Sequence, residues 1–289
     1  RIIQSQNATV SDALYEYWLS SILSAPMTHI VNTTSNTFYA FWDLFVQRLV
    51  EAGVSSVMGG QYQQFQEVVE MARGIGPAAA WAWQAAVQAF RSDAPIFSVM
   101  FSDDERSKIE NVTIDALDSA LAKVMGPVGY NVGSIIRTPL RMLTMMDEFN
   151  KAFVGRLEVV AAAYRIAKQE GFSGDALRAR QEELINDIKS PAWEEAVETA
   201  HRLTFQEELG PAGKAVQGFV KNTPGVRWFV PFIRTITNIV KVGIRKSPFG
   251  ALRTVYKVSN NKYADEGMES FIRDVSENLL SFAFTAAVY

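Results

Sequence analysis

His29, Asn32 and Asn36 are spaced by three and four residues, so a helix would place all three on one face. An imidazole beside two amides could hold a ligand or relay protons. A polar seam between packed helices has the same pattern, because buried amide and hydroxyl side chains on helices hydrogen-bond one another. We favour the seam.

Asp147 and Glu148 are residue types that perform general acid–base catalysis. Sequence neighbours point about 100° apart on a helix, however. Asp147 also precedes Lys151 by four residues, the spacing of a helical ion pair. His201 has no acidic or nucleophilic companion at a diagnostic spacing, so none of these groups is predicted to be catalytic.

The composition narrows the chemistry further. The chain has no cysteine and two histidines, which excludes disulfides, thiolate zinc sites and cysteine nucleophiles. The Gly-Lys pair in GPAGKA lacks the spacing and the Ser or Thr of a phosphate-binding loop. We therefore expect a protein that is not an enzyme, without a cofactor and without a metal site.

Positive charge is concentrated in one part of the chain. From Leu209 to Ala264 there is no Asp or Glu, although the whole chain carries a net charge of -3. This stretch, the basic block, holds ten of the 28 Lys and Arg residues, which leaves 18 basic residues against 31 acidic ones elsewhere. The ten are Lys214, Lys221, Arg227, Arg234, Lys241, Arg245, Lys246, Arg253, Lys257 and Lys262.

As a helix, residues 229–244 would separate apolar from basic side chains. The apolar face consists of Phe229, Phe232, Ile233, Ile236, Val240 and Ile244. Arg234, Lys241 and Arg245 share another face, and the same spacing recurs at Lys246, Arg253 and Lys257 beyond Pro248. Aromatic residues such as Trp228 and Tyr256 are interleaved, which suits a lipid interface or stacking on bases.

Two interpretations of the basic block stay open at this point. Its ten residues could bind a polyanion, either a nucleic-acid backbone or anionic lipid headgroups. Alternatively, they could pair with the acidic remainder of the chain as an internal interface.

The elements that position these residues are predicted to be helices throughout. No run alternates apolar and polar residues between hairpin turns, as a strand would. The uncharged segment from Gly74 to Phe90 would reach only about 21 Å from Pro77 onward, against roughly 30 Å of hydrocarbon, so we interpret it as a buried helix. The expected helices cover residues 11–24, 28–52 with an end at Gly53, 61–73 closed by Gly74, 77–90, about 113–125, 139–170, 191–206 and 265–289, with a loop over 91–108.

The helix after Thr138 carries the strongest local signals. Thr is a favoured cap, and Pro139 suits the first helical position. Gly171 is expected to end the helix. Apolar residues recur there at spacings of three and four, which predicts one continuous buried face. They are Met146, Phe149, Phe153, Leu157, Val160, Tyr164 and Ala167.

The predicted fold is all-α, an extended multi-helix bundle. We divide it into an N-terminal helical region (1–133), a long-helix region (134–208) and a basic helical region leading into an apolar helix (209–289). The chain begins without Met and stops within the apolar run LLSFAFTAAVY. We expect it to be a piece of a longer polypeptide.

Four motifs occur in order and together resemble a known family. They are LSAPMTHIVNTTSN (23–36), RTPLRMLTMMDEF (137–149), LTF (203–205) and VPFIRTITNIVK (230–241). They are similar to a helical region of the very large internal virion proteins, also described as polyvalent or DNA-ejection proteins, of tailed bacteriophages and prophages. The family pattern usually has proline after the second Arg-Thr, where this chain has Ile236.

The resemblance implies a structural segment that is carried in the virion and delivered with the genome. Its expected location is inside the capsid and then in the host envelope. Its expected partners are portal, core or other ejection proteins, the viral DNA backbone without sequence specificity, the host inner membrane, and further copies of itself. The alternatives are a helical scaffold flanking an enzyme domain, such as a peptidoglycan hydrolase or a virion polymerase, and a membrane-active helical protein.

Overall fold

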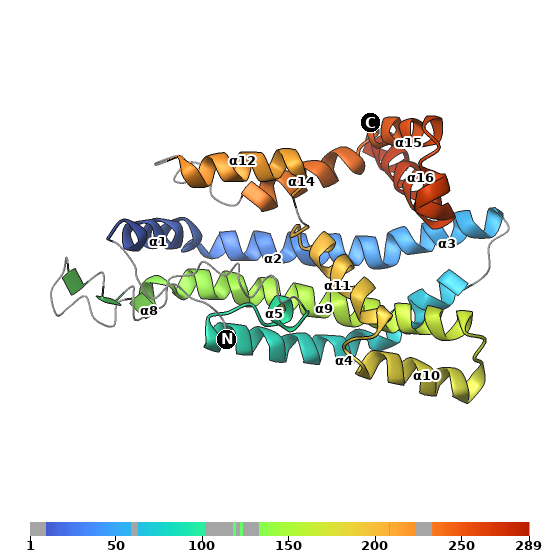
Figure 1. The fold of residues 1–289 in the computed structure, drawn as a ribbon, viewed down its shortest axis with the longest axis horizontal. Helices are drawn as coiled ribbons and strands as arrows, with labels where there is room; N and C mark the ends of the chain where they lie inside the picture. Colours follow the sequence, from blue (N-terminus) through green and yellow to red (C-terminus); the bar gives the residue numbers. More distant parts are fainter. Residues whose placement is uncertain are drawn as a thin grey trace. The chain divides into compact units, whose positions relative to one another are not determined.

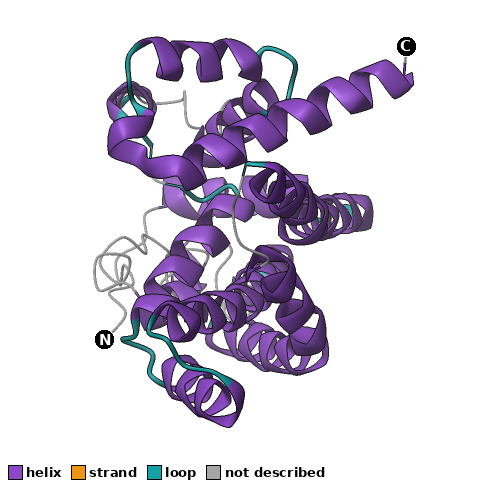
Figure 2. Cartoon of the chain, turned by 90° about the vertical axis from the view of Figure 1, so that its right-hand side faces the viewer, coloured by secondary structure: helices purple, strands orange, loops and turns teal. Residues whose placement is uncertain are grey.

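The computed structural model describes residues 10–58, 63–101, 118–119, 122–123, 133–207, 209–223 and 233–288. All regular structure in these ranges is helical, which confirms the all-α prediction (Figures 1 and 2). In chain order the elements are α1 (Val10–Leu23), α2 (Pro26–Phe41), the π-helix η1 (Trp42–Gln47), α3 (Arg48–Val57), α4 (Gln63–Ser92), α5 (Ile96–Phe101), α8 (Gly133–Ile136), α9 (Thr138–Gln169), α10 (Gly174–Asn186), α11 (Pro191–Leu203), α12 (Pro211–Asn222), α14 (Ile233–Arg245), α15 (Gly250–Ser259) and α16 (Tyr263–Val288).

The chain forms two compact units, each built from separate segments. Unit 1 comprises residues 1–37 and 76–156, and unit 2 comprises residues 38–75 and 157–289. These units do not follow the three consecutive regions expected from the sequence, because residues far apart in the chain pack together within each unit.

Unit 1 is held together by small apolar residues and by buried polar contacts. The α4 face from Ala78 to Ala89 is lined with buried alanines, whereas Trp83 on another face is 56% exposed, so the helix expected to be buried is buried on one face. Arg141 of α9 donates from Nε to the carbonyl of Phe90, at 2.9 Å. Arg137 lies 2.8 Å from Asp93, measured from Nε to Oδ2. These contacts join the C-terminal end of α4 to the first turns of α9.

Two glycines that were expected to end helices do not. The helix that contains Gly53 continues to Val57, and α4 passes through both Gly74 and Pro77. A Cβ at Gly74 would lie 3.7 Å from side-chain atoms of Leu157 and Val160 in unit 2. The helix therefore persists because its packing outweighs the low helix propensity of these residues.

Other expected boundaries have mixed outcomes. The interruption near Pro26 is confirmed, since α1 ends at Leu23 and α2 begins at Pro26. The expected loop over 91–108 contains the short helix α5, and residues 102–108 lie outside the described part. Of the helix expected near 113–125, only 118–119 and 122–123 are described, and these are helical.

The predicted C-terminal end of α9 is confirmed, but its start is shifted by one residue. The Arg141 amide donates to the Arg137 carbonyl at 2.9 Å, so Thr138 is already helical and is not the cap. The helix begins at Thr138 and stops before Gly171, whose φ is +89°. The Gly171 amide donates to the Lys168 carbonyl at 3.0 Å, and the Phe172 amide donates to the Ala167 carbonyl at 3.1 Å. These are the two hydrogen bonds of a Schellman motif, which favours glycine at this position.

The prediction of a single buried face on α9 is wrong for its central turns. Ala161, Ala162 and Ala163 are all fully buried, and three consecutive residues cannot lie on one face of a helix. Packed residues therefore surround this part of α9. Phe153, expected on the buried face, is half-buried.

The rest of unit 2 consists of α10 and α11 followed by α12, α14, α15 and α16. The predicted helix start at Pro191 is confirmed, although the Ser190 hydroxyl donates to the Leu184 carbonyl at 2.7 Å and does not cap α11. Helix α14 packs against α12 and α15, and α16 packs against α15 and α3. Residues 224–232, the start of the helix expected over 229–244, lie outside the described part. Within the described ranges, no helix is both long enough and apolar enough to cross a membrane.

Candidate interaction surface

The structure separates the ten residues of the basic block into three groups. Exposed side chains belong to Lys214, Lys241, Arg253 and Lys262. Side chains paired with carboxylates belong to Arg245, Lys246 and Lys257. The side chains of Lys221 and Arg234, and the whole of Arg227, lie outside the described part.

Lys246 and Arg202 converge on the buried carboxylate of Asp43, which η1 carries. Lys246 Nζ lies 2.7 Å from Asp43 Oδ1, and Arg202 Nη1 lies 3.3 Å from Oδ2. Burial alone would raise the pKa of Asp43, but the two cations outweigh it and hold the pKa well below its usual range. Asp43 is therefore ionised and fixes the end of α14 against η1.

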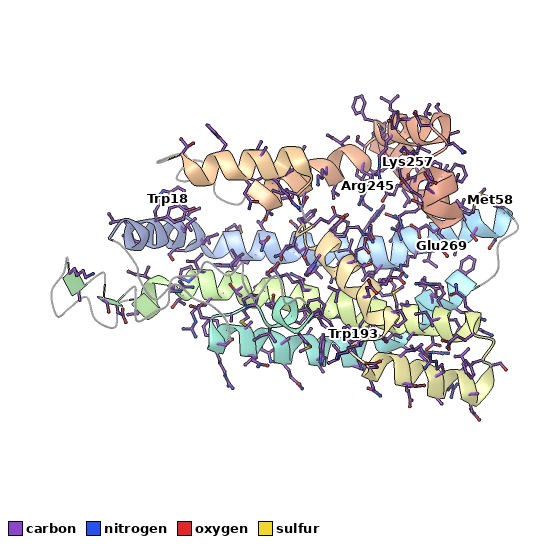
Figure 3. All side chains as sticks on the ribbon, viewed as in Figure 1. Trp18, Met58, Trp193, Arg245, Lys257 and Glu269 are labelled. Carbon is purple, nitrogen blue, oxygen red and sulfur yellow. The ribbon has the colours of Figure 1, made fainter. Side chains whose placement is uncertain are left out.

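Arg245 and Lys257, both labelled in Figure 3, pair with carboxylates on α16. Arg245 Nε lies 3.2 Å from Glu277 Oε2. Lys257, which is 8% exposed, lies 2.9 Å from Asp274, and the Tyr263 hydroxyl donates to the same carboxylate at 2.7 Å. Burial acts to raise the pKa of Asp274, and the hydrogen bonds from Lys257 and Tyr263 lower it below its usual range. For these basic residues the structure shows internal pairing, the alternative interpretation of the block.

Because these charges point inward, the apolar side chains of α14 and α15 point outward. Asn238 on α14 is 1% exposed and donates from Nδ2 to the carbonyls of Phe205 and Glu207, both at 2.9 Å. Leu252 on α15 is 67% exposed. The exposed apolar residues of the two helices and their junction, called here the α14–α15 surface, are Ile236, Ile239, Val240, Ile244, Phe249, Leu252, Val255, Tyr256 and Val258.

The α14–α15 surface has a clear chemical character. Lys241, Arg253 and Lys262 are exposed within or beside it, and its sequence contains no carboxylate. Isolated exposed apolar residues are normal on proteins, but contiguous ones on neighbouring helices mark an interaction site. Apolar side chains with basic neighbours suit a partner that is both apolar and anionic.

A second charged cluster, which the sequence did not indicate, lies in unit 2 around a cavity of about 220 Å³. Glu67 Oε2 lies 3.1 Å from Arg165 and 3.7 Å from Arg48. Each arginine has a nearer carboxylate, since Arg48 Nη2 lies 2.5 Å from Glu158 and Arg165 also pairs with Glu195. The other oxygen of Glu67, Oε1, is buried without a hydrogen-bond partner among the described residues.

This arrangement changes the pKa of the Glu67 carboxyl group. Burial raises its pKa to about 7, and the attraction of Arg165 and Arg48 does not compensate for the lost hydration. A carboxyl group that titrates near neutral pH can act as an acid or a base. The hydroxyl-bearing residue that lines this cavity is Ser55, and no hydrogen bond between Ser55 and Glu67 is seen among the described residues. The cluster links α3, α4, α9 and α11 through ion pairs.

The residues weighed for catalysis from the sequence lie in the following surroundings. Asn36 donates to Asn32 at 3.4 Å within α2, and His29 on the same helix is buried. The buried atoms His29 Nδ1 and Thr33 Oγ1 have no hydrogen-bond partner among the described residues, so the mutual hydrogen bonding expected of a polar seam is seen only for the two asparagines. Lys151 lies 2.8 Å from Asp147, which confirms the predicted ion pair.

Glu148, which was not singled out from Asp147, is the more buried of the two. It pairs with Lys151 at 2.9 Å and accepts the Phe97 amide at 2.5 Å. His201 is half-buried on α11. In the part of the chain that the structure describes, no cluster of His, Asp or Glu is arranged to hold a metal ion.

Comparisons of the chain with protein-family models, with curated proteins and with solved structures find no match.

Proposed function

We propose that this chain is a non-enzymatic structural segment of a bacteriophage internal virion protein, which helps to form a core or conduit for DNA delivery across the host envelope. The four ordered motifs supply the setting. The observation that carries the structural role is the α14–α15 surface, where polar residues pack inward and apolar residues face outward. Such a surface serves assembly, because its apolar side chains are buried only against a partner.

The partner of this surface is proposed to be anionic. The exposed residues Lys241, Arg253 and Lys262 lie in a stretch without Asp or Glu. Anionic lipid satisfies both features, since headgroups attract the lysines while the aliphatic side chains enter the acyl boundary. A DNA backbone satisfies only the charge. Lipid is therefore the favoured partner, and DNA is the second outcome of the same test.

The test compares two doubly substituted variants of the full chain, each with the same change in net charge. Lys241→Glu with Lys262→Glu alters the exposed lysines of the surface. Lys168→Glu with Lys189→Glu alters two exposed lysines elsewhere in unit 2. Binding to vesicles containing phosphatidylserine and to duplex DNA is measured for both, with circular dichroism to verify folding.

A lysine near an anionic bilayer contributes about 1 kcal/mol, so the first variant is expected to lose more than about tenfold in vesicle affinity. The control variant should keep most of its affinity. Equal vesicle binding by both variants and the unsubstituted chain would contradict the lipid assignment. A selective loss of DNA binding alone would assign the surface to nucleic acid.

A further inference from the structure

A cavity of about 240 Å³ lies in unit 2, where the end of α2 and η1 meet α16. One wall consists of the aromatic rings of Phe38, Tyr39 and Trp42. Leu280 and Phe284 of α16 also line the cavity. The cavity is separate from the exposed residues of the basic block, and its chemistry is independent of a virion role.

The π-helix shapes the first wall. Hydrogen bonds in a π-helix join residues five apart, so Gln47 and Trp42 fall on the same face and both line the cavity. One-turn π-helical segments occur frequently at functional sites. The π-helix by itself does not identify a ligand. The cavity that it lines also contains buried hydroxyl groups without hydrogen-bond partners in the part of the chain that the structure describes.

Two hydroxyl groups of the lining residues have no hydrogen-bond partner among the described residues. They are Tyr39 Oη and Ser281 Oγ, and both atoms are buried. Ser281 is 7% exposed, so its hydroxyl is almost fully removed from bulk solvent. A buried hydroxyl without a partner is unfavourable, and a ligand that supplies one removes that penalty.

The charged groups at the cavity are already paired. Lys246 Nζ lies 2.7 Å from Asp43, and Glu277 lies 3.2 Å from Arg245. A charged ligand would have to compete with these ion pairs. The cavity therefore favours a neutral molecule that accepts or donates hydrogen bonds.

Tyr39, one residue of the aromatic wall, is held in place by two neighbouring groups. Tyr39 stacks on Phe205 with ring centroids 5.0 Å apart. Lys246 Nζ also lies over the Tyr39 ring, 5.3 Å from its centroid. An aromatic wall favours a flat ring, which it contacts by offset stacking or edge-to-face packing.

We infer that this cavity binds the ring of a neutral aromatic compound that carries a hydrogen-bonding group, as indole and phenol do. The cavity is open to solvent on one side, since Phe38 and Phe284 are 63% and 65% exposed, and its volume of about 240 Å³ leaves room for a bicyclic ring. The ring can belong to a free small molecule or to a Trp or Tyr side chain of a partner protein. The chemistry is the same in both cases.

The test titrates the full chain with indole, with indene and with N-acetyltryptophanamide by calorimetry. Indene has the shape of indole without the N–H group, so it measures the polar contribution. Indole is expected to bind with a dissociation constant below about 1 mM, and indene about tenfold more weakly. N-acetyltryptophanamide distinguishes a side-chain ligand from a free molecule.

Two variants and one control locate the site. Ser281→Ala should weaken indole binding by about tenfold and leave indene unchanged, if the hydroxyl is the indole's partner. Phe284→Ala, at a residue that is 65% exposed and so tolerant of truncation, should weaken both ligands. Phe282→Ala, two residues away and outside the cavity lining, should change neither.

The binding results support or overturn the assignment of an aromatic ligand to this cavity as follows. Saturable binding of indole or of N-acetyltryptophanamide that responds to both variants supports the assignment, and the tighter of the two identifies the source of the ring. Absence of binding by both compounds overturns it. Equal affinities for indole and indene, or insensitivity to Phe284→Ala, overturn it as well.

Discussion

The buried carboxyl group of Glu67 makes the stability of unit 2 depend on pH near neutrality, and Glu67→Gln is the change that tests this. The pKa of Glu67 is raised from 4.5 to about 7 in the folded chain, because Glu67 is buried and both of its arginine neighbours have nearer carboxylates. Since the folded-state pKa is higher than the unfolded one, the proton on Glu67 stabilises the fold. That stabilisation is complete below the unfolded pKa and is lost as the pH rises through about 7.

The size of the effect follows from the shift. Each pKa unit corresponds to about 1.4 kcal/mol, so a shift from 4.5 to about 7 amounts to about 3 kcal/mol in full. Between about pH 5 and pH 8 the free energy of unfolding should fall by about 2–3 kcal/mol from this group alone. Glutamine has the same shape and does not titrate, so the Glu67→Gln variant should lack this part of the decrease.

The assay is urea unfolding followed by circular dichroism at several pH values across that window. Glu170→Gln is the matched control, because Glu170 also pairs with an arginine, at 2.7 Å, but on the surface. The control should keep the pH dependence of the unsubstituted chain. If Glu67→Gln also keeps it, Glu67 is ionised throughout the window and the reasoning about its burial is wrong.

Four further substitutions test the packing. Asp43→Ala should lower the free energy of unfolding by about 3–5 kcal/mol, since it leaves Lys246 and Arg202 without their shared carboxylate; a loss below 1 kcal/mol would show that the cluster is solvated. Leu157→Ala should cost about 2–5 kcal/mol because Leu157 is fully buried, whereas half-buried Phe153→Ala should fall below the 3–5 kcal/mol expected for an enclosed ring, and the reverse order would misplace α9. Gly171→Ala should cost about 1–2 kcal/mol, as its φ of +89° disfavours a side chain; an unchanged unfolding midpoint would argue against the Schellman motif. All four are measured by denaturant unfolding.

The ends of α9 could be predicted because their chemistry is local. Pro139 presets the first turn and Gly171 supports a left-handed residue, and neither depends on distant parts of the chain. The course of α4 could not be predicted in this way. Gly74 and Pro77 are poor helix residues in isolation, and the helix continues through them because Gly74 packs close to Leu157 and Val160.

The charged clusters could not be predicted from the sequence, because their partners are far apart in the chain. The hydrogen bond from Gln47 to Glu277 joins residues that are 230 positions apart, so no local spacing indicates it. The composition of the basic block showed that its charges must meet negative charge. It could not show that Lys246 and Lys257 turn inward while Lys241 stays exposed.

The orientation of α14 illustrates the same limit. Its sequence separates apolar from basic residues, which indicates an amphipathic helix but not which side packs. Asn238 fixes which side of α14 packs, because its amide donates hydrogen bonds to two carbonyls that precede α12. The apolar side of α14 therefore faces outward. The exposed apolar surface on which the proposed function depends therefore emerges only from the fold.

The most direct test of the virion assignment is an immunoblot of purified phage particles and of infected-cell fractions with an antibody raised against this chain. The account predicts a reactive polypeptide far larger than the 32.1 kDa of residues 1–289, present inside the particles and recovered in the host envelope fraction after genome delivery. A reactive band near 32.1 kDa that is confined to the cytoplasm of infected cells and absent from particles would contradict it.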